Sequence, residues 1–179
     1  LVFIMKIIED FLPQSQFNHI KDTLLSDTFP YYYQPHVLEG YDDLGGIFKI
    51  PKKDENADYF FSHNLYTSKD KQSDRKLLDT ILLPIILKLD VKQLVRAKVN
   101  LYTNQHRHIH TQYHIDSHNE DVKAAIYYVN TNNGYTKFET GEKASSLENS
   151  IVLFDAHKRH KAVSQTDTKT RVNININYL

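Results

Sequence analysis

From about residue 95 onward the chain is a succession of short apolar runs separated by turn residues, which leaves few folds open to it. The runs cover residues 95–103, 110–116, 122–130, 135–140, 150–155, 160–164 and 170–178. None of them shows the 3.6-residue period of a helix, and each has the length of a strand. Short strands in this number are typical of an antiparallel sandwich or barrel.

Two turn signals divide these runs. Asn132-Asn133-Gly134 is a strong hairpin signal, so we predict a tight turn that joins the strands at 122–130 and 135–140. The polar residues from Thr166 to Lys169 predict a turn before the last strand.

The first half of the chain has a different pattern. A first helix is predicted to begin near Pro13, and a second over residues 73–89, where Pro84 should end or kink it. Aromatic segments at 29–33, 46–50 and 59–67 are predicted strands or extended loops. We expect the helices to pack outside one sheet, giving an α+β fold. The chain would then be one domain over residues 1–179, with 1–94 supporting a β-barrel-like core at 95–179.

Composition excludes several classes of protein. The 179 residues include no cysteine, which excludes disulfide scaffolds, thiol nucleophiles and cysteine-bound metal sites. The formal net charge is zero, which argues against nucleic acid as a partner. No apolar run reaches 18 residues and the N-terminal residues lack a cleavage site, so we expect neither a membrane helix nor a signal peptide. A cytoplasmic, intracellular protein is the expectation.

Histidine is the residue that points to chemistry. Five of the ten histidines lie between His106 and His118. On a strand, His114 and Asp116 would point to the same side, because residues two apart share a face. A third ligand from a distant strand would complete a two-histidine, one-carboxylate site, which favours non-haem Fe(II). The alternative is a surface His and Asp in a turn, since this spacing is common by chance.

The last run alternates strictly. Val172, Ile174 and Ile176 form an apolar face, and the opposite face is polar, made of Arg171, Asn173, Asn175 and Asn177. Two readings are open: an edge strand with a solvated polar face, or a strand whose polar face lines a ligand cavity. In a cavity, the arginine would be a bidentate partner for a carboxylate.

Taken in order, these motifs resemble the 2-oxoglutarate- and Fe(II)-dependent dioxygenases, particularly the prolyl 4-hydroxylase-like branch. His160 follows His114 by 46 residues, and Arg171 follows His160 by 11, as the pattern of that family requires. The resemblance covers about residues 95–178. Further matching segments are Asn100-Leu101-Tyr102, Ile126-Tyr127-Tyr128-Val129-Asn130, Asn133-Gly134-Tyr135-Thr136 and the run from Arg171 to Tyr178.

The resemblance implies a double-stranded β-helix, a jelly-roll or cupin-like barrel of two antiparallel sheets. It also implies that His114, Asp116 and His160 hold Fe(II), with 2-oxoglutarate as cosubstrate and O2 as oxidant. The implied activity is hydroxylation of an unactivated C–H bond, and the carboxylate of Asp116 favours hydroxylation over halogenation. A small molecule or a peptide is the implied substrate, with a prolyl or other amino-acid side chain as one form of it.

Cosubstrate binding is implied for five further positions. Arg171 would bind the distal carboxylate of 2-oxoglutarate, and Tyr102 and Tyr128 would hydrogen-bond the same molecule. Tyr128 shares a strand face with Ala124 and Ile126, so it can point inward while Tyr127 packs outward. Second-rank candidates for this pocket are Thr136 and Asn175.

Rival ligands and rival functions remain open. His118 with Glu120 offers another His-x-carboxylate, and His157 competes with His160, but we prefer the first set because of the family spacing. His106, His108 and His110 alternate on a strand face or an extended loop, and we expect a loop that faces solvent or substrate rather than a second metal site. The alternative functions are a cupin-type metal protein with a non-oxidative activity and a non-catalytic binding module on the same fold, with an alkylated-nucleic-acid demethylase as a minor variant. The oligomeric state is left open.

Overall fold

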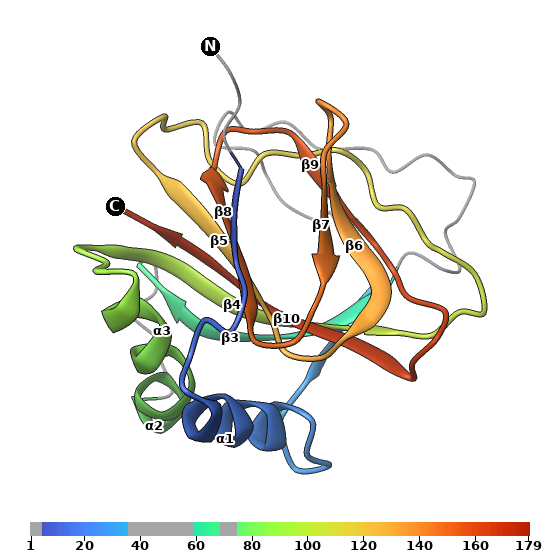
Figure 1. Cartoon of the computed structure of the whole chain (residues 1–179), viewed down its shortest axis with the longest axis horizontal. Coiled ribbons are helices and arrows are strands. Elements are labelled where there is room, and N and C mark those ends of the chain that lie inside the picture. The colour runs from blue at the N-terminus through green and yellow to red at the C-terminus, as the bar shows by residue number, and fades with distance from the viewer. Residues whose placement is uncertain (1–4, 36–58, 69–74) are drawn as a thin grey trace.

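The ten strands of the part of the chain described by the computed structural model, residues 5–35, 59–68 and 75–179, lie in two sheets (Figure 1). Every strand pairing is antiparallel. The larger sheet has the order β1-β8-β5-β10-β4-β3-β2, and the smaller has the order β7-β6-β9. The expected α+β architecture with a barrel of two antiparallel sheets is confirmed. The strands are β1 (Lys6–Ile8), β2 (Tyr32–Gln34), β3 (Phe60–Thr67), β4 (Leu94–Thr103), β5 (Lys123–Tyr128), β6 (Asn132–Phe138), β7 (Lys143–Ser146), β8 (Ser150–Asp155), β9 (His160–Val163) and β10 (Thr170–Tyr178).

The predicted strand at 110–116 is wrong. This segment forms only two isolated bridges to β9, His110 with Val163 and His114 with His160. Between the bridges, the hydroxyl of Thr111 accepts the hydrogen bond of the Ala162 amide, which replaces a regular ladder bond. Conversely, β7 was not predicted, because its sequence Lys-Ala-Ser-Ser has no apolar run.

The predicted hairpin at 132–134 is also wrong. These residues begin β6, and β5 and β6 lie in different sheets. The Asn132 side chain accepts the Gly134 amide and donates to the carbonyl of Asn130, so it turns the chain between the sheets rather than back along β5. A register shift between Asn132 and Tyr135 on β6 marks the irregularity.

Helices cover one face of the larger sheet (Figure 1). The first, α1 (Gln14–Leu24), starts directly after Pro13 as expected. The second predicted helix is interrupted near Pro84 as expected: α2 (Arg75–Leu77) passes into a π-helical turn at Leu78–Leu82 and then α3 (Leu83–Lys88). Proline has no amide hydrogen to donate within a helix, which accounts for the irregular turn. Residues 73–74 and the predicted segment 46–50 lie outside the described residues. No described helix is long and apolar enough to cross a membrane.

Strand β10 divides the interior in two. It lies between β5 and β4 in the middle of the larger sheet, so the solvated edge strand is excluded. Its apolar face, with Ile174 and Ile176, packs against the helices in one buried cluster. Its polar face points between the two sheets, where Arg171, Asn173 and Asn177 are buried. A second apolar cluster shares that space; it consists of Val122, Ala124, Ile126, Tyr128, Phe138, Ala144, Val152, Phe154 and Ala156.

Candidate metal centre

The backbone brings His114, Asp116 and His160 together. His114 and His160 exchange two backbone hydrogen bonds of 2.9 Å each, and the Asp116 amide donates to the carbonyl of Ala156 at 2.8 Å. The segment that carries the first two residues is therefore attached to the start of β9 at His160 and to the turn after β8 at Ala156. Residues separated by 46 positions in sequence become neighbours through these few bonds.

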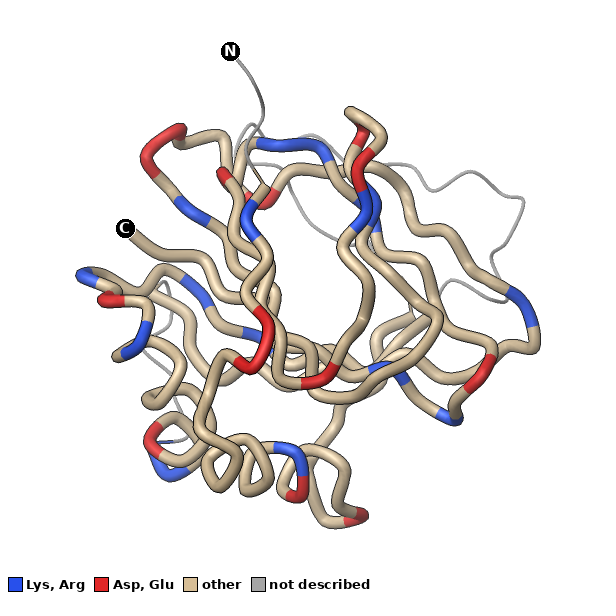
Figure 2. Tube along the Cα trace, viewed as in Figure 1, with Lys and Arg blue, Asp and Glu red and all other residues tan. Residues whose placement is uncertain are grey.

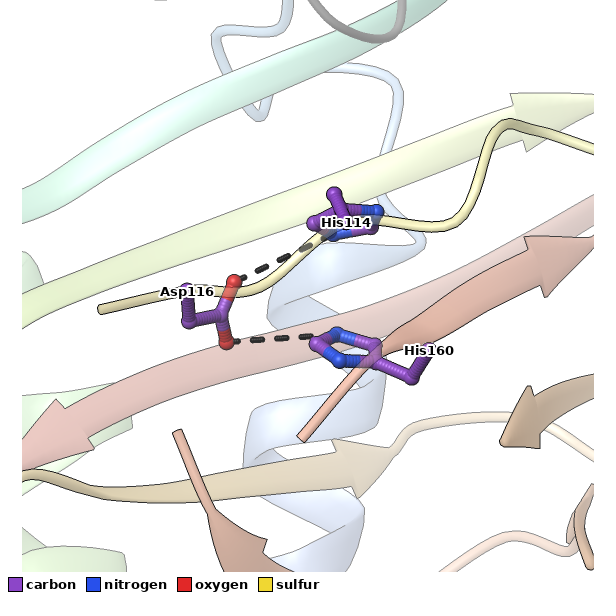
Figure 3. A group of neighbouring side chains, drawn as sticks. All are labelled: His114, Asp116 and His160. Carbon is purple, nitrogen blue, oxygen red and sulfur yellow. Dashed lines mark ion pairs between the residues drawn. The ribbon is translucent and has the colours of Figure 1, made fainter. Parts of the chain in front are cut away.

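The three side chains converge on one point between them (Figure 3). Their potential ligand atoms all lie within 4.8 Å of one another. Nε2 of His114 is 3.9 Å from one carboxylate oxygen of Asp116, and Nε2 of His160 is 4.0 Å from the other. These separations are too long for hydrogen bonds. Both are shorter than twice an ordinary metal–ligand distance of about 2.1 Å, so the atoms can share an ion.

The second nitrogen of each histidine is held by the backbone. Nδ1 of His114 is 3.2 Å from the carbonyl oxygen of Gln112, and Nδ1 of His160 is 2.9 Å from that of Lys158. A carbonyl can only accept, so these contacts place the ring proton on Nδ1. The lone pair of each Nε2 is then directed at the centre, which is the form that binds a metal.

Electrostatics hold His114 and Asp116 in their ligand forms. Burial, together with the neighbouring His160, lowers the pKa of His114 to about 4, so its imidazole is neutral at pH 7. Burial alone would raise the pKa of Asp116. The nearby His160, Arg96 and His114 and a hydrogen bond from Asn177 outweigh this effect and lower it to about 2. The centre therefore offers a charged carboxylate and a neutral imidazole at physiological pH.

Two residues that the sequence did not reveal position Asp116. Nδ2 of Asn177 donates to one carboxylate oxygen at 3.1 Å, and Nη2 of Arg96 lies 3.4 Å from the other. Arg96 also donates through Nε to the side-chain oxygen of Asn177 at 3.2 Å. The three side chains form a closed set of contacts that fixes the carboxylate. The available signal was the polar face of the last strand, on which Asn177 shares parity with Arg171.

Arg171 lies fully buried in the same interior without a carboxylate partner among the described residues. Its Nε donates to the hydroxyl of Ser146 at 2.8 Å, and its Nη2 lies 3.5 Å from the hydroxyl of Thr136. Its Nη1 has no hydrogen-bond partner within the described part of the chain. A buried guanidinium with one free nitrogen is costly unless an anion pairs with it. The surroundings therefore fit a carboxylate at this place.

The other predicted cosubstrate residues differ in how closely they approach Arg171. Tyr128 is buried, its hydroxyl donates to Thr136 at 2.8 Å, and burial raises its pKa, so it stays a donor. The half-buried Tyr102 lies with its ring 5.4 Å from the guanidinium carbon of Arg171. Asn175 is half-buried two strand positions beyond Asn173, in register with Lys98 on β4. Ser146, which contacts Arg171 most closely, was not predicted because β7 was missed.

Arg171 and the His-Asp-His cluster are connected through the inner face of β6, because Thr136 on this strand contacts Arg171. Phe138 on β6 pairs in register with His160, and Thr136 lies two residues before Phe138 on the same strand. Residues two apart on a strand are about 7 Å apart. A small dicarboxylate could therefore contact both places at once.

The rival histidines stay outside the cluster within the described residues. His118 is exposed in the loop after Asp116, and His157 is half-buried with no described partner for its Nδ1. His106, His108 and His110 are exposed, as expected of a loop.

Comparison with known proteins gives matches at the level of structure. No family model matches the sequence, and no curated protein matches it. A non-haem alpha-ketoglutarate-dependent epimerase of nogalamycin biosynthesis matches with a TM-score of 0.62 and 11% identity over 99% of this chain and 78% of that one. A prolyl hydroxylase from Trichoplax adhaerens, solved with a peptide fragment of hypoxia inducible factor, gives 0.58 and 14% over 98% and 83%.

A prolyl-4-hydroxylase from Pseudomonas putida gives a TM-score of 0.56 and 14% identity over 99% of this chain and 92% of that one. At such identities the likeness shows the fold. The predicted resemblance to 2-oxoglutarate/Fe(II) oxygenases, including prolyl hydroxylases, is confirmed at that level, with the jelly-roll barrel that these proteins share.

Proposed function

We propose that the protein is a 2-oxoglutarate- and Fe(II)-dependent oxygenase that hydroxylates an unactivated C–H bond. One observation carries the proposal. A convergent His-Asp-His cluster and a buried arginine with a free nitrogen face the same interior and are connected through β6, where Thr136 contacts Arg171 and Phe138 pairs in register with His160. A metal protein without an acidic cosubstrate would have no use for the second feature.

In this proposal His114, Asp116 and His160 hold the metal, and Arg171 binds the far carboxylate of 2-oxoglutarate. Bound Fe(II) and 2-oxoglutarate supply the oxidising chemistry, in which O2 is consumed, succinate and CO2 are released and one oxygen atom enters the substrate. Tyr128 and Thr136 orient the carboxylate end, and Tyr102 and Asn175 are the further cosubstrate contacts that we propose.

The chain itself contributes position and a dry environment. Arg96 and Asn177 fix Asp116 by direct contacts, so the carboxylate is oriented before any ion arrives. Phe154 and Phe138 pack their rings 4.8 and 6.0 Å from that of His160. These apolar walls exclude water from one side of the centre and strengthen its electrostatic interactions.

A prolyl or other amino-acid side chain is the substrate class that we propose, in a peptide or as a free amino acid. Two of the three structures compared are prolyl hydroxylases, one of them in complex with a peptide. This likeness of fold supports the choice, and an assay with defined substrates tests it directly.

The test is release of succinate from 2-oxoglutarate with Fe(II) and O2, over a panel of proline-containing peptides and free amino acids. His160→Ala should abolish release, and the matched variant His118→Ala should retain it. Wild-type protein that binds Fe(II) yet neither binds 2-oxoglutarate nor forms succinate would overturn the proposal in favour of a cupin-type metal protein.

A further inference from the structure

Three lysines stand in one row across the smaller sheet. Lys137 on β6 pairs in register with Lys143 on β7 and with Lys161 on β9. The neighbouring residues Thr136 and Ala144 are buried in the interior, so the three lysines lie on the outer face. Adjacent strands are about 4.8 Å apart, and the lysine row therefore spans roughly 10 Å.

Among the described residues, no carboxylate neutralises the lysine row. None of its three ammonium groups forms an ion pair with another described side chain. The acids nearest in sequence are engaged elsewhere: Glu139 pairs with Arg159 at 3.1 Å, and Glu142 accepts a hydrogen bond from Thr140. Like charges directly opposite on neighbouring strands destabilise a sheet. No described carboxylate relieves this repulsion within the fold.

Aromatic rings and histidines border the lysine row. The ammonium of Lys143 lies 4.7 Å from the ring centre of Tyr135, and that of Lys161 lies 4.6 Å from that of Tyr113. The neighbouring His110 is close enough that its partial burial, together with the charges of Lys161, His108, Lys137 and Lys143, lowers its pKa. Figure 2 shows the basic positions of these strands as neighbouring blue segments.

We propose that the lysine row is a docking surface for an acidic segment of a partner protein. Carboxylates three or four residues apart on a helix are about 5–6 Å apart, which matches the spacing of the row. Proteins that bind single-stranded nucleic acid stack bases on free aromatic faces, whereas one face of each tyrosine ring here already contacts an ammonium group. Charge complementarity without a stacking platform favours an acidic polypeptide.

This surface is separate from the metal centre although it is built on the same strand. Lys161 follows His160 directly, and Tyr113 precedes His114, with their side chains on opposite faces. A docked partner would therefore sit behind the two histidines and leave the interior free. The inference does not depend on the proposed oxygenase activity.

The experiment measures fluorescence anisotropy of a labelled deca-glutamate peptide. The triple variant K137Q/K143Q/K161Q should bind it roughly tenfold more weakly than wild type, since each exposed charge pair contributes only modestly and three of them are lost. The control K6Q/K76Q/K169Q removes the same charge from exposed lysines on other surfaces and should bind almost as wild type.

Three results would overturn the inference: equal weakening in both triple variants, no binding of deca-glutamate to wild type at low salt, or tighter binding of a labelled decathymidylate than of deca-glutamate. The last result would assign the row to a phosphate backbone. Removing like charges should not lower the thermal midpoint of the row variant. If it does, the single variant K137Q, at the centre of the row, replaces it in the same assay.

Discussion

Gly134→Ala tests whether the close approach of β6 to Arg171 shapes the proposed anion pocket. A Cβ at position 134 would lie 2.7 Å from Cδ of Arg171, 2.8 Å from the side-chain oxygen of Asn132 and 2.9 Å from the carbonyl oxygen of Val163. One of these atoms belongs to the backbone of β9 and cannot move without disturbing the β6–β9 pairing. The side chains of Arg171 and Asn132 must therefore shift, and the contact with the Val163 carbonyl strains the β6–β9 pairing.

The expected cost follows from the crowding. Forcing one extra carbon into a packed interior destabilises a protein by about 1–3 kcal/mol. For a chain of this length, about 2 kcal/mol lowers the thermal midpoint by ~4–8 °C. Displacing the guanidinium from Ser146 and Thr136 should also weaken 2-oxoglutarate binding by at least about tenfold, whereas metal affinity should stay near that of wild type. Calorimetric titrations of Mn(II) and then 2-oxoglutarate separate the two effects.

Gly141→Ala is the matched control. Gly141 has φ of +108°, and no atom of the described residues lies within 4 Å of the place that a Cβ would take there. Alanine at this position therefore strains the backbone without touching the interior. This variant should lose stability yet keep 2-oxoglutarate affinity. Equal weakening of 2-oxoglutarate binding in both glycine variants would refute the prediction, as would a Gly134→Ala variant whose midpoint and affinity are unchanged.

Three further predictions follow from the centre. Asp116→Asn should keep the metal-free fold, because an amide oxygen can still bond Asn177, but it should abolish turnover and the rise in thermal midpoint that Fe(II) gives; an undiminished rise would contradict the metal assignment. Arg171→Lys keeps the charge and loses the planar guanidinium, so calorimetry should show a much larger loss of 2-oxoglutarate affinity than of Fe(II) affinity. Equal loss of both affinities would indicate a folding role instead. The pKa of His114 is about 4 in the fold against about 6.5 when unfolded, so between these values the unfolded chain binds more protons. Denaturant unfolding of metal-free protein should therefore show stability that is full above pH 6.5 and falls by up to about 3 kcal/mol toward pH 4, and a flat profile would refute this.

The sequence predicted those parts of the fold that alternation or helical period determines. The strict alternation of β10 gave the correct division of its two faces, and Pro84 gave the correct interruption of the second helix. The errors arose where a side chain replaces a backbone partner. Asn132 bonds within its own loop, and Thr111 completes a ladder position with its hydroxyl, so neither segment follows the pattern of its neighbours.

For the candidate site, the sequence identified residues by order and spacing, and the structure brings His114, Asp116 and His160 together. The sequence alone could not identify Arg96, because a single arginine on a strand carries no signal about a carboxylate 20 residues away. Ser146 was beyond reach for a similar reason: a short polar strand has no period, and its contact with Arg171 depends on the packing of one sheet on the other.

The paired backbone bonds between His114 and His160 also determine how the site opens. Both amide hydrogens lie in the same isolated bridge, so neither can exchange with solvent deuterium until the 110–116 segment leaves β9. Amide exchange is limited by such local opening, and two amides released by one event exchange with equal protection. The rate of deuterium uptake at these two amides would thus report how often the local opening separates His114 from His160, and the measurement needs neither ligand nor turnover.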